Sequence, residues 1–172
     1  GWFDDIIIAT GVTPRRLDIP GADHPSVVSY ADILSGVRTA GRRVAVIGAG
    51  GIGFDIAEFL SSGPTSEVMD PDHFAAEWGF DRSIATRGGL ARPADEAPRR
   101  EIVMLQRKPG RMGRGLGVST GWILRLQLAK RKVAQLTGVT YRRIDDQGLH
   151  VTVGPEDRVI PADTIVVCAG QE

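Results

Sequence analysis

The run Gly48–Gly53 is the part of the sequence whose spacing best suits chemistry, because it has the pattern G-x-G-x-x-G. In such a turn the first glycine permits a tight bend, the second leaves room for a diphosphate, and the third lets the following helix pack closely on the strand. Unpaired amide hydrogens at the start of that helix, together with its dipole, favour the anion. The run therefore predicts a dinucleotide site; the alternative is a strand–helix turn that needs glycine for packing alone.

Basic residues follow the next apolar strand after this turn. A dinucleotide site usually ends its second strand with an acidic residue that binds the ribose hydroxyls, whereas Gln106, Arg107 and Lys108 stand here. Cationic side chains at this position suit a 2′-phosphate, so the sequence favours NADP over NAD. Arg111 and Arg114, a few residues further on, are additional candidates.

Charge is balanced over the chain but concentrated locally. The 21 basic residues equal the 21 acidic ones, which argues against attraction of the whole molecule to nucleic acid or to an anionic membrane. Residues 99–132 nevertheless hold ten basic residues against Glu101 alone. A solvated basic face or a nucleic-acid patch would also explain such a run, but no aromatic residue stands between 99 and 121 to stack on bases. We expect NADPH as the ligand, and neither a nucleic acid nor a membrane as a partner.

The elements that must position these residues follow in the order strand, turn, helix, strand. Residues 43–47 and 102–106 are apolar enough for strands covered on both faces, and apolar side chains recur at helical spacing over 52–60. The interval from Gly53 to Gln106 exceeds the ~20 residues that usually separate the last glycine from the end of the second strand. Because no other apolar strand lies between 60 and 102, we interpret 61–98 as an insertion into one strand–helix–strand unit.

Similar patterns predict the remaining elements. The expected fold is α/β, a Rossmann-like three-layer NAD(P)-binding domain with a parallel sheet and a β-meander. The further strands are expected at 6–9, 133–136, 139–144, 149–153 and 159–169, and the further helices after Ser29, over 71–78 behind Asp70, and over 122–132. The expected division is a FAD-domain stub and connector over 1–40, the NADPH-binding domain over 41–160, and a return crossover over 161–172.

Composition removes several other classes of protein. A chain of 172 residues is long enough to bury one hydrophobic core without disulfide bonds or bound metals. With Cys168 as the only cysteine and three scattered histidines, neither an internal disulfide nor a metal site is expected. Apolar runs fall far short of the ~18 residues of a membrane span, and no leader pattern opens the sequence. We expect a cytoplasmic protein, and both ends of the sequence look like cuts in a longer polypeptide.

Motifs spread over nearly the whole chain resemble the bacterial NADPH-dependent 2,4-dienoyl-CoA reductases. More broadly, residues 9–11, 48–53 and 168–170 are similar to the NAD(P)H domain that is inserted within the FAD domain of flavoproteins with two dinucleotide folds. The finer motifs are Gly50–Asp55, Glu77–Gly79, Gly88–Leu90, Ile102–Lys108, Gly115–Gly117, Thr120–Ile123, Ile144–Asp146, Gly148–Val151 and Cys168–Glu172.

This resemblance implies a multidomain enzyme in which NADPH reduces FAD, electrons pass through a 4Fe-4S cluster to FMN, and reduced FMN with an acid in a barrel domain reduces the dienoyl thioester. The chain has no cysteine set for a cluster. It would be the NADPH module, acting with the FAD and barrel domains of the same polypeptide and carrying no catalytic residue itself. The alternative is a non-catalytic ADP- or dinucleotide-binding domain of a related iron–sulfur flavoprotein such as trimethylamine dehydrogenase.

The resemblance also assigns residues to roles. Asp55 falls where related reductases carry a carboxylate near the nicotinamide, although an acid at a helix start is equally well satisfied by the helix dipole. Thr10 and Gly11 would approach the FAD edge of the nicotinamide pocket, and Ala169 and Gly170 would line the return crossover. The residues expected to meet the diphosphate are Gly48, Ala49, Gly50, Gly51, Ile52 and Gly53, and those expected to meet the 2′-phosphate are Gln106, Arg107, Lys108 and Arg114.

Overall fold

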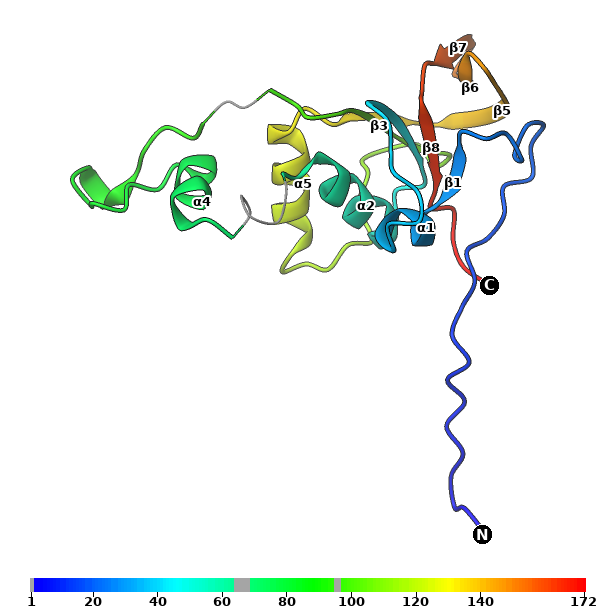
Figure 1. Ribbon diagram of the computed structural model, residues 1–172, viewed down its shortest axis with the longest axis horizontal. Coiled ribbons are helices and arrows are strands. Elements are labelled where there is room, and N and C mark those ends of the chain that lie inside the picture. Colours follow the sequence, from blue (N-terminus) through cyan, green and yellow to red (C-terminus); the bar gives the residue numbers. More distant parts are fainter. Residues whose placement is uncertain (1, 64–68, 95–96) are drawn as a thin grey trace.

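Two sheets and a group of helices make up the body of the protein in the computed structural model, which describes residues 2–63, 69–94 and 97–172 (Figure 1). The larger sheet is parallel, with the strand order β1-β8-β2-β3-β4, and the smaller is an antiparallel meander, β5-β6-β7. The strands are β1 (Val27–Ser29), β2 (Arg43–Ile47), β3 (Glu101–Gln106), β4 (Ala134–Thr137), β5 (Val139–Asp145), β6 (Gly148–Val153), β7 (Glu156–Ile160) and β8 (Thr164–Val167). The helices are α1 (Tyr30–Leu34), α2 (Gly51–Ser61), α4 (Pro71–Trp78), the 3-10 turn η1 (Arg87–Gly89) and α5 (Gly121–Lys130).

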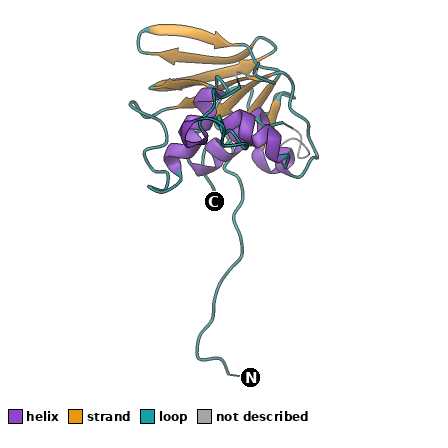
Figure 2. Cartoon of the chain, turned by 90° about the vertical axis from the view of Figure 1, so that its left-hand side faces the viewer, coloured by secondary structure: helices purple, strands orange, loops and turns teal. Residues whose placement is uncertain are grey.

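Alternate side chains of the parallel strands face two different halves of the core. Val46 of β2 packs in the same cluster as Phe54 of α2, whereas its neighbour Ile47 packs in the same cluster as Leu149 of β6. The helices therefore cover one face of the parallel sheet and the meander covers the other, and Figure 2 shows the helices gathered on one side of the strands. This is the three-layer α/β fold that the sequence predicts.

The strands β2 and β3 are neighbours despite the long interval between them. They pair in parallel register, with Ile47 opposite Leu105, and α2 follows β2 directly. The predicted strand–helix–strand unit is present, and its two strands end at the same edge of the sheet.

The segment between α2 and β3 lies outside the sheet and extends from the helical side of the molecule (Figure 1). Its helix α4 is capped by Asp70, whose carboxylate accepts a hydrogen bond from the backbone N–H of Asp72 in the first turn, as the sequence predicts. Glu77 accepts a hydrogen bond from Arg131 at 2.9 Å, and the ammonium group of Lys130 lies 4.6 Å from the centre of the Trp78 ring. These contacts hold α4 against the end of α5. None of the helices in the described ranges is long and apolar enough to cross a membrane.

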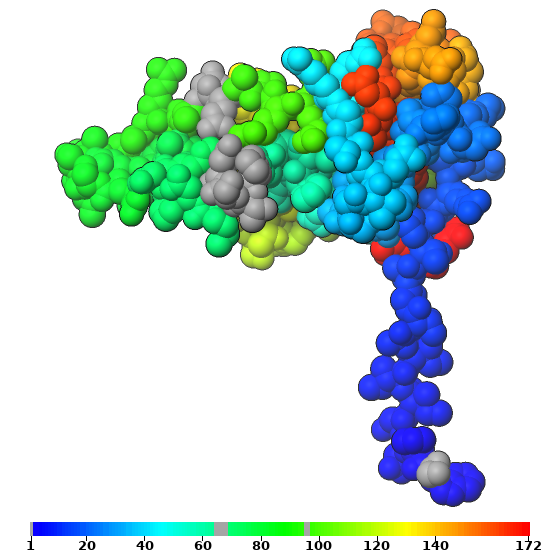
Figure 3. Space-filling model, viewed as in Figure 1, coloured from blue at the N-terminus to red at the C-terminus, as the bar shows by residue number. Residues whose placement is uncertain are grey.

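The strand predicted at residues 6–9 is wrong for this structure. Residues 2–9 run as an extended segment that projects from the body (Figure 3), and Ile6 and Ile7 are 81% and 91% exposed. A short apolar run predicts a buried strand but not which part of the protein covers it. No described strand pairs with residues 6–9. Thr10 and Gly11 belong to the same exposed segment.

The single long strand predicted over 159–169 is also wrong, because the structure divides it in two. The strand β7 ends at Ile160 in the meander, and β8 starts at Thr164 in the parallel sheet. Pro161 stands between them and cannot donate a ladder hydrogen bond. The chain changes sheets at this point.

Two connecting segments, residues 13–15 and residues 170–172, run antiparallel beside each other. The backbone N–H of Thr13 donates to the carbonyl of Glu172 at 2.8 Å, and the reverse bond is 2.9 Å. The N–H of Arg15 donates to the carbonyl of Gly170 at 3.0 Å, and the Arg15 guanidinium pairs with the Glu172 carboxylate. Residues 13–15 and 170–172 are thus joined as a short antiparallel pair.

Candidate dinucleotide-binding site

The glycine turn sits where β2 ends, at the centre of the parallel sheet. The N–H of Gly48 donates to the Leu105 carbonyl of the neighbouring strand at 2.8 Å. The backbone of Gly48 has φ +111°, and a Cβ there would lie 2.3 Å from the carbonyl oxygen of Cys168. A Cβ on Gly53 would lie 2.1 Å from the carbonyl oxygen of Gly48. These two glycines are required by the bend and by the packing of α2 on the turn.

Gly50 and Gly51 have no such structural reason. A Cβ at either position meets no atom within 4 Å, and neither residue has a positive φ. Gly50 is the N-cap of α2, and no side chain caps the exposed amide hydrogens of the first turn. Open space and unpaired donors at a helix N-terminus are what a diphosphate needs, so this cradle fits a dinucleotide.

The residues predicted to meet the 2′-phosphate follow β3 directly beside this turn. Arg107 and Lys108 are exposed, and the Arg114 guanidinium lies 3.8 Å from where a Cβ of Gly110 would stand. Because the N–H of Gly48 donates to Leu105, the last residue but one of β3, the glycine turn and the start of the basic loop lie at the same edge of the sheet. Arg111 is exposed in the same loop.

Gln106 lies at the same edge but uses its side chain differently from the prediction. Its amide nitrogen donates to the carbonyl oxygens of Lys108, at 2.9 Å, and of Gly110, at 3.1 Å. The side chain therefore binds the loop that carries the cations.

Tyr141, from β5, also supports this edge, and sequence reasoning missed it. Its hydroxyl donates to the Leu105 carbonyl at 3.0 Å, the same carbonyl that accepts from Gly48. Burial raises the pKa of Tyr141 to about 12, with a smaller opposing effect of the nearby Arg107. No local pattern marks this tyrosine, because its partner lies on another strand far away in the sequence.

Removing the Tyr141 hydroxyl is expected to weaken the fold modestly. Tyr141→Phe loses one hydrogen bond, worth about 0.5–1.5 kcal/mol in the free energy of unfolding, which urea denaturation would measure. Because the folded-state pKa lies above the ordinary value, this contribution is complete below the ordinary tyrosine pKa and is lost as the pH rises through about 12. An equal free energy of unfolding for both proteins at neutral pH would contradict the expectation.

The other predicted residues fall into two groups. Ala169 lies beside the turn, since its backbone nitrogen is 3.3 Å from the Cβ position of Gly48, and Gly170 follows it in the crossing segment. Asp55 lies one turn further along α2, exposed at a surface cavity of about 760 Å³ that Arg38 and Glu58 also line. Thr10 and Gly11 are not brought to the glycine turn, and a Cβ at Gly11 would meet nothing within 4 Å.

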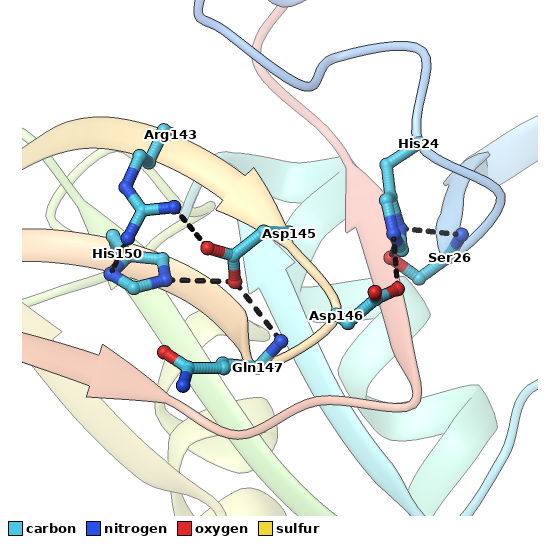
Figure 4. A network of polar contacts seen from close by, with 7 residues as sticks. All are labelled: His24, Ser26, Arg143, Asp145, Asp146, Gln147 and His150. Atoms are coloured by element: carbon cyan, nitrogen blue, oxygen red, sulfur yellow. Dashed lines mark hydrogen bonds and ion pairs between the residues drawn. The ribbon is translucent and has the colours of Figure 1, made fainter.

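A polar network fastens the N-terminal connector to the meander, on the side of the molecule shown in Figure 4. His24 hydrogen-bonds to Asp146 at 3.1 Å, and His150 to Asp145 at 2.8 Å. The hydrogen bond from His150 lowers the pKa of the Asp145 carboxyl, and Arg143 pairs with the same carboxylate. His150 thus has a structural partner within the meander. No group of three or more potential metal ligands is found among the residues that the structure describes.

A parallel sheet with a glycine turn of this kind at the carboxyl ends of its strands is typical of dinucleotide-binding domains. Within that class, the chain belongs to the pyridine nucleotide-disulphide oxidoreductase family, whose model matches residues 2–172. It is therefore an oxidoreductase domain of a kind associated with FAD and NAD(P).

Several known proteins similar to this chain are named as reductases. A metal reductase of Desulforamulus reducens is 27% identical over 170 residues, which are 99% of this chain and 24% of that protein. A cinnamate reductase of Clostridium sporogenes is 40% identical over 57 residues, which are 33% of this chain and 8% of that protein. Among solved structures, a 2-naphthoyl-CoA reductase complex has a TM-score of 0.67 at 24% identity, covering 95% of this chain and 20% of that one. The chain spans about a quarter or less of the length of these three proteins.

Proposed function

We propose that this chain is the NADPH-binding domain of a 2,4-dienoyl-CoA reductase, a multidomain flavoenzyme that would also hold FAD, FMN and a 4Fe-4S cluster. The observation that carries the dinucleotide part is the hydrogen bond of 2.8 Å from Gly48 to Leu105, because it joins the open glycine cradle to the strand that Arg107 and Lys108 follow. The substrate class rests on the resemblance of the sequence motifs. It is supported by two similar proteins named as reductases of cinnamate and of 2-naphthoyl-CoA.

In this proposal the chain binds and orients its ligand. The amide hydrogens of Gly51 and Ile52 hold the diphosphate at the start of α2, and Arg107, Lys108 and Arg114 hold the 2′-phosphate. Bound NADPH would supply a hydride to FAD, so that the nucleotide is oxidised and the flavin reduced. Asp55 is assigned to the nicotinamide side of the same site, and Ala169 and Gly170 to the return crossover beside the turn.

The domain division belongs to the same proposal. Residues 1–40 and 161–172 would connect to a FAD domain, and 41–160 would form the NADPH-binding domain. The pairing of residues 13–15 with 170–172 supports this division, because it places the two connectors beside each other. The partners would be NADPH and the other domains of the polypeptide, in the cytoplasm, without a nucleic acid or a membrane.

The test is a set of titrations on the protein expressed from its complete gene. Calorimetry should show tighter binding of NADPH than of NADH, and anaerobic NADPH should bleach the FAD absorbance. A 2,4-dienoyl-CoA should then reoxidise the reduced enzyme, whereas the saturated acyl-CoA of the same length should not. Binding of ADP and NADPH without flavin reduction would favour the non-catalytic dinucleotide module instead. If the reduced enzyme were reoxidised only by another electron acceptor, the proposed substrate class would be wrong.

A further inference from the structure

Both hydrogens of the side-chain amide nitrogen of Gln106 are used by the loop that follows this residue. An NH₂ group has two donor hydrogens, and the two acceptors of Gln106 are the carbonyl oxygens of Lys108 and Gly110. The opposite orientation of the amide would set its oxygen against both carbonyls, so the hydrogen-bond network fixes which end is the nitrogen. Only an acceptor oxygen remains, and an acceptor cannot hydrogen-bond a phosphate oxygen that carries no proton.

The same loop is held from a second direction. The N–H of Gly138, in the turn between β4 and β5, donates to the Lys108 carbonyl at 3.3 Å. That carbonyl therefore accepts from both Gln106 and Gly138. Gly110 has φ +91°, a conformation that other residues rarely adopt. Residues 106–110 are thus a tied loop rather than an open strand end.

This tied loop carries the cations. Arg107 and Lys108 are within it and are exposed, and the Arg114 guanidinium lies 3.8 Å from the Cβ position of Gly110. Long cationic side chains lose conformational entropy when they close on a phosphate. A backbone already fixed by hydrogen bonds lowers that cost, because only the side chains remain to be ordered.

We propose that Gln106 is a positioning residue that sets the preference for the 2′-phosphorylated dinucleotide through the loop, without touching the phosphate. This inference rests on the proposed function, since it assumes that the loop faces the 2′-phosphate. It replaces the sequence expectation that Gln106 is itself a phosphate ligand. The residue selects the ligand by shaping the backbone on which Arg107 and Lys108 stand.

The test begins with Gln106→Met, which keeps the length of the side chain and removes both donors. In the protein expressed from its complete gene, its affinity for NADPH should fall about tenfold, because the loop that carries the cations loses two of the hydrogen bonds that fix it, while its affinity for NADH stays unchanged. Gln147→Met is the matched control, because Gln147 is exposed in the turn between β5 and β6, and it should leave both affinities unchanged. Amide hydrogen exchange of the nucleotide-free protein should be faster at Gly138 in Gln106→Met alone.

A double-mutant cycle separates positioning from direct contact. In a background of Arg107→Ala and Lys108→Ala, Gln106→Met should cause little further loss of NADPH affinity, because the loop no longer presents those cations. An undiminished further loss would mean direct contact and would overturn the inference, as would an unchanged exchange rate at Gly138 or an unchanged NADPH preference. If the unmodified protein itself shows no preference for NADPH over NADH, the proposed coenzyme fails and this inference fails with it. An unchanged preference in Gln106→Met alone refutes only the positioning role.

Discussion

Gly50→Asp is expected to abolish dinucleotide binding while leaving the fold at least as stable. A Cβ at this position meets no atom within 4 Å, and the residue is the uncapped N-cap of α2. Aspartate is a preferred N-cap and favours the positive end of the helix dipole by about 0.3–1 kcal/mol. Its carboxylate would also stand where the diphosphate binds. Two like charges about 4 Å apart repel by ~4 kcal/mol near a protein surface, which corresponds to a loss of affinity on the order of 1,000-fold.

Urea denaturation and calorimetry with both NADPH and NADH would measure the two effects. Gly53→Ala provides the contrast, because its Cβ would lie 2.1 Å from the Gly48 carbonyl oxygen. That variant should lose stability, whereas Gly50→Asp should lose only binding, and equally for both dinucleotides. If Gly50→Asp still binds them with unchanged affinity, the glycine turn is a packing feature alone.

Reversing the charge of Arg107 or Lys108 is expected to weaken NADPH binding selectively. Each charge-assisted hydrogen bond to a phosphate is worth about 1.5–3 kcal/mol, so Arg107→Glu and Lys108→Glu should each lower NADPH affinity by roughly 10-fold to 150-fold. NADH lacks the phosphate and should change far less. Calorimetric titration of each variant with both dinucleotides measures the ratio directly.

The matched control for this pair of variants is Arg92→Glu, which makes the same change of charge at an exposed residue of the segment between α2 and β3. It should leave the ratio of NADPH to NADH affinity unchanged. Equal losses for the two dinucleotides in Arg107→Glu would mean that the basic loop attracts anions generally. Coenzyme selection would then lie elsewhere in the molecule.

The sequence predicts best those parts of the fold that depend on patterns among neighbouring residues. β2, the glycine turn and α2 follow from an uninterrupted apolar run, glycine spacing and helical periodicity. Even the pairing of β2 with β3 across 61–98 could be inferred, since no other apolar strand competes in that interval. In the candidate site, the proximity of Arg107 to the turn follows from this pairing alone.

Several differences from the sequence prediction have one physical cause, which is that contacts between residues distant in sequence leave no local mark. The apolar residues 6–9 look buried by composition, but no described strand pairs with them. Gln106 is a different case, because its partners are close in sequence. The path of the loop decides whether its amide meets them, and no sequence pattern reveals that path. The hydrogen bond from Tyr141 to Leu105 joins two sheets. Pro161 did offer a local signal for the break between β7 and β8, and the apolar character of both sides concealed it.

The position of β8 sets the order in which the molecule can assemble. It is the last strand in sequence, yet it lies between β1 and β2 in the parallel sheet. While the chain is being synthesised, the two earlier strands have no partner between them until residue 167 has left the ribosome. Gly48 acquires its neighbour Cys168 only at that stage. The nucleotide cradle is therefore incomplete until β8 has been synthesised, and a nascent chain that stops before β8 would lack the residues that pack against Gly48.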